Sequence, residues 1–393
     1  MMRTLIFACL LFTQTLFGVT LPEMIEKALE KNPSLEVIEA RLQANKQSID
    51  IADQFANPEL SVVKNTLDSS QAMSKTVVSL KQKIPYYSKR AKREGVAVAE
   101  DALLKERLRA AEVKLVGKIK VEAYQIWQLR ELRSIIDEYI VLTQRNITLY
   151  ESYTSMSDNQ HMGIMKAELS LSDLQVQRAL LDSQIAQAYA RLSALTAFRV
   201  EGLELELEVA NRPELQKYQK SLHYNPDIAL KERAIDKQTA KVDLAAINNY
   251  PDINLLAGYA YREKYDNYFN VGVGLSLPIY GTEDVKEERE RALLLAKHSQ
   301  KEDTQLKVNA ALEAYYAQML AAYKIYHIIH DDALPQVAHM FELSNSSIAT
   351  GSDLFKYIDV LFQKLALEKK SIIAIANYNK AEAKIAELQG KRQ

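Results

Sequence analysis

The sequence predicts a mainly α-helical chain that also carries four β-strands of the type found in membrane β-barrels, arranged as two structural repeats. Three observations predict this fold class. Two stretches without proline, 86–212 and 279–334, are long enough for helices far beyond ordinary globular length. Three prolines in the first half recur at a constant spacing in the second half. Four short segments alternate apolar with polar or small residues at a period of two.

The charge balance of the chain argues against nucleic-acid binding. The sequence has 50 Lys and Arg residues and 51 Asp and Glu residues, which gives a formal net charge of -1. A nucleic-acid binder needs a basic excess that can replace the counterions around phosphates. We therefore expect no nucleic-acid partner.

The N-terminus has the pattern of a secretory signal peptide, which we expect to span residues 1–18. Arg3 precedes an apolar core at residues 5–12, and small residues surround Gly18. A buried N-terminal helix is the alternative. The single cysteine, Cys9, lies inside this segment, so the rest of the chain has no thiol for a disulfide or a metal site.

The positions of the prolines indicate two copies of one structural unit. Short stretches around them agree, since ARLSAL from Ala190 corresponds to AKIAEL from Ala383. We predict a first repeat at residues 19–200 and a second repeat at residues 201–393. The matching prolines are separated by 193 residues and are Pro33, Pro58 and Pro85 in the first half and Pro226, Pro251 and Pro278 in the second.

Each repeat is expected to contain the same elements in the same order. A helix runs from the Asn-Pro pair to the next proline, two strands follow, and then come a very long helix and a return helix. The long helices are mildly amphipathic, which predicts antiparallel coiled-coil packing with one wet face. The expected strands are 59–66, 76–84, 252–262 and 268–277, the expected long helices are 88–150 and 283–344, and the return helices begin at the Ser-Asp pairs 157–158 and 352–353.

The alternation in the strands predicts a membrane-facing surface. One face of the last strand is apolar and the other is small or polar, and tyrosines cluster at the strand ends, as in an interfacial girdle. Tyrosines at strand ends also occur in soluble sheets. Four strands cannot enclose a conducting pore, so several chains must contribute to one barrel. The residues expected to face lipid are Val78, Leu80, Val271, Val273, Leu275 and Leu277.

Taken together, these motifs resemble the TolC family of outer-membrane factors over nearly the whole chain from Leu21 to Gly390. The resemblance rests on the duplicated Asn-Pro pair, the corner LSLPIYG at residues 275–281, and the helical tip IATGSD at residues 348–353. The C-terminal pattern ANYNKAEAKIAELQG is similar to the branch of the family that serves heavy-metal and cation efflux pumps.

The resemblance implies a homotrimer with a twelve-stranded barrel in the outer membrane of a Gram-negative bacterium, continued by a helical tunnel in the periplasm. It implies a periplasmic adaptor and an inner-membrane pump as partners, contact with outer-membrane lipid, and passive export of small molecules or metal cations. Alternatives are the outer-membrane component of type I protein secretion, a periplasmic adaptor, and a structural coiled-coil protein. An adaptor has only one hairpin, and a structural coiled coil does not account for the strands.

Two sets of site residues follow from the resemblance. The family places acids at a constricted periplasmic end, which suggests Asp353 and Asp359 as pore-gate or selectivity residues. An ordinary cap or surface role is the alternative for both. The expected adaptor-docking tips are Met156, Ser157 and Asp158 in the first repeat and Gly351 and Ser352 in the second, although Met156 replaces the glycine expected at the first tip.

The sequence contains no catalytic constellation, and we expect neither an enzyme nor a cofactor. His327 and His330 share a helix face next to Asp331, which is a weak metal-site pattern. On a long charged helix such a pair is more often part of a solvated surface, so we expect no metal site.

Overall fold

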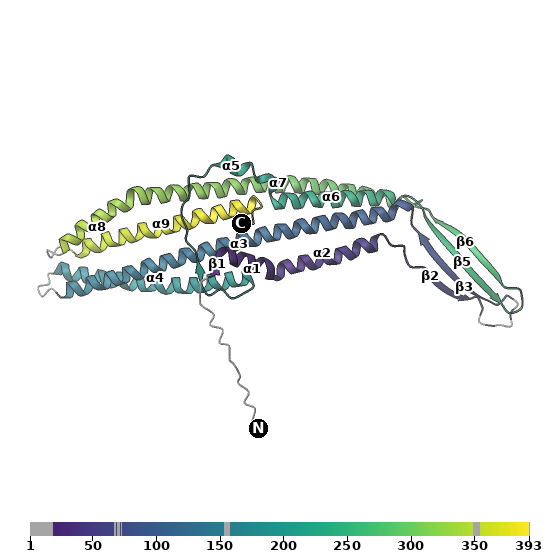
Figure 1. Ribbon diagram of the computed structural model, residues 1–393, viewed down its shortest axis with the longest axis horizontal. Helices are drawn as coiled ribbons and strands as arrows, with labels where there is room; N and C mark the ends of the chain where they lie inside the picture. The colour runs from purple at the N-terminus through teal and green to yellow at the C-terminus, as the bar shows by residue number, and fades with distance from the viewer. Residues whose placement is uncertain are drawn as a thin grey trace, which may run out of the picture.

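The computed structural model describes residues 19–66, 68, 71, 73–152, 158–348 and 354–392, and the expected signal peptide lies outside them. Figure 1 shows an elongated molecule with helices along most of its length and a β-sheet at one end. Within the described residues, no helix is both long enough and apolar enough to cross a membrane.

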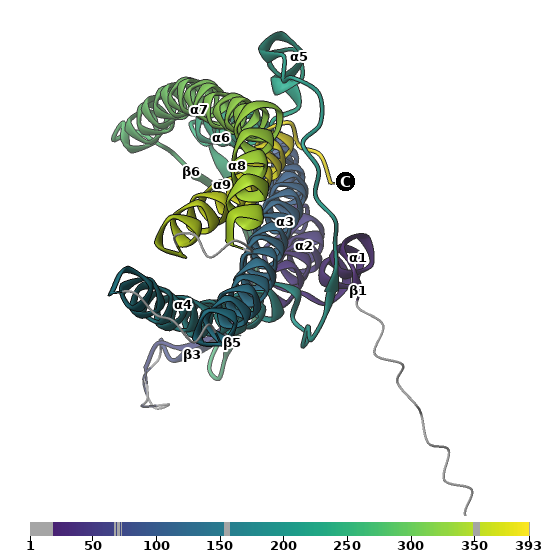
Figure 2. The same cartoon turned by 90° about the vertical axis from the view of Figure 1, so that its left-hand side faces the viewer.

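The helices form a single curved layer. The long helices are α2 (Pro33–Ala52), α3 (Tyr87–Glu151), α4 (Asp158–Thr196), α6 (Pro226–Ile247), α7 (Thr282–His327), α8 (Leu334–Ile348) and α9 (Leu354–Leu388). Helix α3 contacts α2, α4, α6 and α9, and helix α7 contacts α6 and α9. Viewed from the helical end, the helices follow an arc with one concave side (Figure 2). The short elements α1 (Leu21–Lys31) and α5 (Leu215–Gln219) lie on the convex side.

Four strands form the sheet, in the spatial order β2 (Glu59–Lys64), β3 (Lys75–Ile84), β5 (Asp252–Arg262) and β6 (Tyr268–Ser276). The helices to which they connect, α2, α3, α6 and α7, are in contact in the same order. A small parallel pair, β1 (Val19–Thr20) with β4 (Leu203–Glu204), joins the start of the described chain to the connection between repeats.

A proline marks every junction between the sheet and the helices. Pro58 precedes β2, Pro85 follows β3, Pro251 precedes β5 and Pro278 follows β6. Proline has no backbone N–H and cannot extend a strand ladder or a helix past its first turn. The repeated prolines of the sequence therefore set the length of the sheet on all four strands.

The structure confirms the mainly helical fold with four strands, and it corrects one helix. The sequence predicts a continuous helix at 283–344, whereas α7 ends at His327 and a π-helical turn, Ile328–Ala333, connects it to α8. Pro335 lies just after this turn. Its ring would clash with the carbonyl of residue 331 in a regular α-helix, and a wider π turn relieves this clash.

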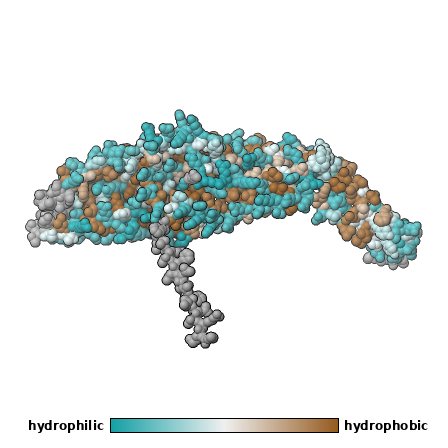
Figure 3. All heavy atoms as spheres, viewed as in Figure 1, coloured by the Kyte–Doolittle hydropathy of each residue, from teal (hydrophilic) through white to brown (hydrophobic). Residues whose placement is uncertain are grey.

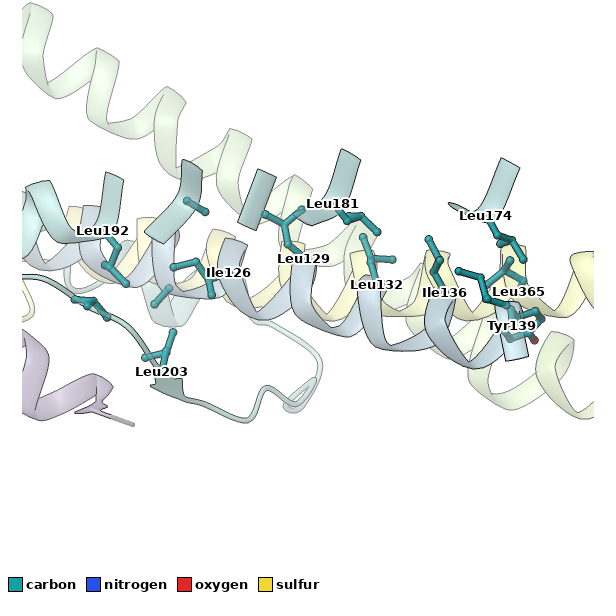
Figure 4. Packing of buried hydrophobic residues seen from close by; sticks show 14 of the residues in the cluster. Ile126, Leu129, Leu132, Ile136, Tyr139, Leu174, Leu181, Leu192, Leu203 and Leu365 are labelled. Atoms are coloured by element: carbon teal, nitrogen blue, oxygen red, sulfur yellow. The ribbon is translucent and has the colours of Figure 1, made fainter. Parts of the chain in front are cut away.

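The apolar core runs along the helical layer, mainly between α3, α4 and α9. Ile126, Ile136, Leu174 and Leu192 are fully buried, and Figure 4 shows α3 side chains facing those of α4 and Leu365 of α9. A second cluster packs α7 against α9 around Tyr378. The buried apolar side chains lie between adjacent helices and not in one central core, so both sides of the helical layer are exposed.

The Asn-Pro pairs make the same contacts in both repeats. Asn32 accepts from the backbone N–H of Ser34 at 2.9 Å and donates to the carbonyl of Leu195 at 2.7 Å. Asn225 accepts from two N–H groups at the start of α6 and donates to the carbonyl of Leu388 at 2.8 Å. Each Asn thus caps one helix and binds the end of another, so α4 continues towards α2 and α9 towards α6.

Candidate functional site: the exposed sheet and the helical tips

The sheet is antiparallel and, within the described residues, open at both edges. β2 pairs only with β3 and β6 pairs only with β5. Directly paired residues in such a sheet point to the same face, so the register assigns each strand residue to one of two faces. The two outer strands keep unpaired backbone groups along one side, which is the side that an additional strand would join.

One face of the sheet is apolar and exposed. Val271 and Val273 are 85% and 70% exposed, so protein contacts hide little of their surface. Apolar surface gathers over the part of the sheet near the helices, and polar surface covers its far end (Figure 3). Such a patch marks an interaction surface. Besides the two valines, the register places on this face Leu60, Val62, Val78, Leu80, Ile253, Leu255, Ala257, Tyr259, Phe269 and Leu275.

Five of the six residues predicted to face lipid lie on this apolar face, namely Val78, Leu80, Val271, Val273 and Leu275. The sixth, Leu277, follows the last residue of β6 and is exposed. Gln82 interrupts the apolar face near the helices, where its amide donates to the carbonyls of Ala56 and Lys83.

The opposite face of the sheet carries small, polar and cationic residues. β6 contributes Asn270, Gly272, Gly274 and Ser276, and β3 contributes Ser79 and three lysines. Lys81 pairs directly with Glu59 of β2, and Lys83 forms an ion pair with Asp252 at 3.1 Å. The two repeats therefore present different charges on the same face.

A buried lysine fixes the junction between the two repeats. Lys89 of α3 donates to the carbonyl of Tyr250 at 2.6 Å and to the Asp252 carboxylate at 2.8 Å. The backbone N–H of Tyr86 donates to the same carboxylate oxygen at 3.1 Å. Sequence reasoning missed this contact because Lys89 has no counterpart in the second repeat, where Thr282 takes its place.

Residues 217–390 match the family model of outer membrane efflux proteins. This part of the chain is therefore an outer membrane efflux protein domain. A search of the curated proteins finds no match.

Solved structures of outer-membrane channels share the fold of this chain. CusC is 14% identical with a TM-score of 0.74, covering 94% of this chain and 91% of its own. The open-state MtrE channel of Neisseria gonorrhoeae is 14% identical with a TM-score of 0.79 and coverages of 94% and 88%. VceC of Vibrio cholerae is 14% identical with a TM-score of 0.78 and coverages of 94% and 96%.

Most of the predicted tip residues lie outside the described residues. This holds for Met156, Ser157, Gly351, Ser352 and Asp353. Asp158 begins α4. The helices that lead to both tips are described, so the tips are bounded by α3 and α4 in the first repeat and by α8 and α9 in the second (Figure 1).

The structure brings the predicted gate acid Asp359 together with a lysine. Lys166 of α4 forms an ion pair with Asp359 of α9, and the Asp359 side chain is 52% exposed. The two residues are 193 positions apart, which is the repeat offset, so they occupy equivalent positions in the two repeats. Sequence reasoning missed Lys166, although the repeat offset applied to Asp359 leads directly to it.

His327 and His330 both contact the Asp331 carboxylate at the π-helical turn. The distances from their Nδ1 atoms are 2.8 and 3.1 Å, and Tyr326 stacks on His330. Hydrogen bonds from the two histidines lower the pKa of Asp331. In the described part of the chain, no group of three or more His, Cys, Asp or Glu residues is arranged to hold a metal ion.

Proposed function

We propose that three copies of this chain form the outer-membrane exit duct of a tripartite efflux system. One observation carries the proposal. Each of the four strands continues into a helix of one curved layer, and the sheet has an exposed apolar face. A closed ring of such layers has strands in the bilayer and helices in the periplasm, with one continuous passage. The family and the channel fold support this function.

The open edges of the sheet support assembly with further copies. An exposed strand edge with an apolar face is an aggregation risk unless another strand covers it. If β6 of one chain pairs with β2 of the next, every edge is covered, and three chains give twelve strands. The helical edges agree, because α4 exposes Leu169, Val176 and Leu180 while α7 exposes Leu295 and Leu306.

The partners follow from the family. A periplasmic adaptor would bind the helical tips, for which Met156, Ser157, Asp158, Gly351 and Ser352 remain the proposed contacts, and an inner-membrane pump would supply the cargo. The lipid-facing role of the apolar sheet face is part of the same proposal.

The gate proposal changes with the Lys166–Asp359 pair. In a trimer, Asp359 would contribute three acids at one level, and Lys166 would place three cations beside them. This ring alternates in sign, so Asp359 would attract cations only when the pair opens. Asp353 remains a second proposed gate acid.

Two neighbouring positions in β6 test the duct. Val273 lies on the apolar face and Gly274 on the opposite face, where a Cβ would meet only ordinary contacts with Asn254. Val273→Lys turns a charge towards lipid, at a cost of about 2–4 kcal/mol near the bilayer midplane. We expect Val273→Lys to reduce the heat-modifiable trimer in membranes and the channel events in planar bilayers.

Gly274→Lys is the matched control, because its charge would face the aqueous passage at the same depth. It should assemble at the wild-type level and still conduct. Equal behaviour of the two variants would contradict the proposed orientation of the sheet, and an absence of channels from the wild-type trimer would contradict the duct itself.

A further inference from the structure

A groove lies between α7 and α9 in the middle of the helical layer. It has a volume of about 770 Å³, which falls in the usual range for sites that bind small molecules. Its lining includes the apolar side chains of Val121 from α3, Ala321 and Ile325 from α7, and Ile373 and Ala374 from α9. The floor can thus receive the apolar part of a ligand.

Three lysines of α9 line the same groove, and none of the residues that line it is acidic. Lys370, Asn377 and Lys384 are seven residues apart, so they form one stripe along the helix. Lys380 lies on the same side, and Gln318 of α7 completes the polar lining. The polar part of this groove is therefore cationic.

The positive charge in the groove is only partly neutralised. Lys380 donates to the side-chain oxygens of Gln125 and Gln128, which are neutral acceptors. Lys370 has no ion-pair partner within the described residues, and Lys384 pairs with Glu387 at 2.8 Å. Two carboxylates lie near the three lysines, Glu387 and the Glu122 carboxylate that already pairs with Arg191, and neither lines the groove.

Two of the three lysines in the groove point away from the convex side of the layer. Tyr378 of α9 donates its hydroxyl to the carbonyl of Asn211, on the connection between repeats that runs along the convex side (Figure 2). At 3.6 residues per turn, Lys380 and Lys384 lie roughly 120 to 160° around the helix from Tyr378. These two lysines therefore point away from the convex side.

We propose that this groove binds an amphipathic organic anion, with its apolar body against the alanine and isoleucine floor and its carboxylate, sulfonate or phosphate at Lys370 and Lys384. The inference rests on the proposed function in one respect: in a closed trimer the concave side faces the passage, so the ligand class is a cargo class. The cationic lining favours organic anions and disfavours the metal cations of the branch that the C-terminal sequence resembles.

Isothermal titration calorimetry on the full-length trimer in lipid nanodiscs tests this site without requiring conduction. The probes are 1-naphthalenesulfonate, the neutral 1-naphthalenemethanol and the cationic 1-naphthylmethylammonium, which share one apolar body. We expect the sulfonate to bind at least tenfold more tightly than the other two. The double variant Lys370→Gln with Lys384→Gln should remove that preference.

Lys369→Gln is the matched control. Lys369 neighbours Lys370 on the same helix, but it donates to Gln177 of α4 and does not line the groove. This variant should keep the sulfonate preference. Equal affinity for the three probes, or an unchanged preference in the double variant, overturns the inference. Bilayer conductance is measured in parallel. A trimer that conducts but does not bind the sulfonate contradicts only the proposed anion site, and a trimer that binds the sulfonate but does not conduct contradicts only the proposed duct.

Discussion

Replacing Asn225 tests how the Asn-Pro pair holds the repeat together. This residue is 1% exposed, and its side chain makes three hydrogen bonds, two accepted from α6 and one donated to Leu388. Loss of an N-cap costs about 1 kcal/mol, and an acceptor left without its donor in a partly buried site costs about 1 kcal/mol more. We therefore expect Asn225→Ala to lower the free energy of unfolding by about 2 kcal/mol.

Asn225→Asp separates the two contributions. The carboxylate keeps the accepted bonds at the start of α6, but it cannot donate to Leu388 and would repel that carbonyl. We expect the free energy of unfolding to fall by about 1 kcal/mol, because only the donated hydrogen bond is lost. The measurement is urea unfolding of the periplasmic helices, followed by circular dichroism on the trimer.

The control is Asn379→Ala. Asn379 also donates to backbone carbonyls, that of Glu208 at 2.9 Å in an exposed contact and that of Ile375 at 2.9 Å within its own helix, but it caps no helix. Its loss should cost less than about 0.5 kcal/mol, the usual limit for a surface change. If Asn225→Ala is no more destabilising than Asn379→Ala, the reasoning about the cap is refuted.

Three further predictions concern a glycine pair, the gate and the groove. Gly390 has a φ of +71°, and a Cβ there would lie 2.7 Å from the carbonyl of Tyr224, whereas a Cβ at Gly95 meets nothing. Gly390→Ala should therefore destabilise the protein by at least about 1 kcal/mol, while Gly95→Ala should stabilise α3 by up to about 1 kcal/mol, both measured by urea unfolding. At the gate, Lys166→Gln should raise the cation preference in bilayer reversal potentials and Asp359→Asn should lower it; unchanged potentials in both variants would exclude a role for this pair in selectivity. In the groove, burial lowers the pKa of Lys380 to about 8. The charged and polar groups near the Lys380 ammonium are Lys370 and Lys384 on α9, Gln318 on α7, and Gln125, Gln128 and Glu122 on α3. Deprotonation above that pKa removes a positive charge, so the affinity for 1-naphthalenesulfonate should fall between pH 7 and pH 9, and Lys380→Met should flatten that dependence.

Local patterns of the sequence predicted most of the fold. The alternation of valine and glycine places Val271 and Gly272 on opposite faces whatever surrounds the strand, and the spacing of the prolines bounds the sheet because proline ends a hydrogen-bond ladder anywhere. The π-helical turn before Pro335 was not predicted, because a helix can accommodate an internal proline in several ways.

The site was less predictable than the fold, because its chemistry depends on pairs of residues from distant segments. Asp359 was identified as an acid near the tip, but its partner Lys166 lies on another helix and in another repeat. The lysines of the groove looked like ordinary surface charges on α9, and only the packing of α7 against α9 places them beside an apolar floor. Periodicity predicts which face of a helix is apolar, but it does not predict where two packed helices leave a groove between them.

The prolines at the four junctions have a mechanical consequence. At each of Pro58, Pro85, Pro251 and Pro278 the regular hydrogen bonding of a strand or helix is interrupted, so the chain crosses from bilayer to periplasm without a continuous ladder. The Lys89 contacts hold the junctions at Pro85 and Pro251 together, so a change of tilt or twist that begins at the distant helical tips can be absorbed at the outer junctions, Pro58 and Pro278, by rotation about the backbone bonds next to each proline. Movement at the tips therefore does not require any strand to slip or separate, and the sheet can keep its shape while the other end of the molecule moves.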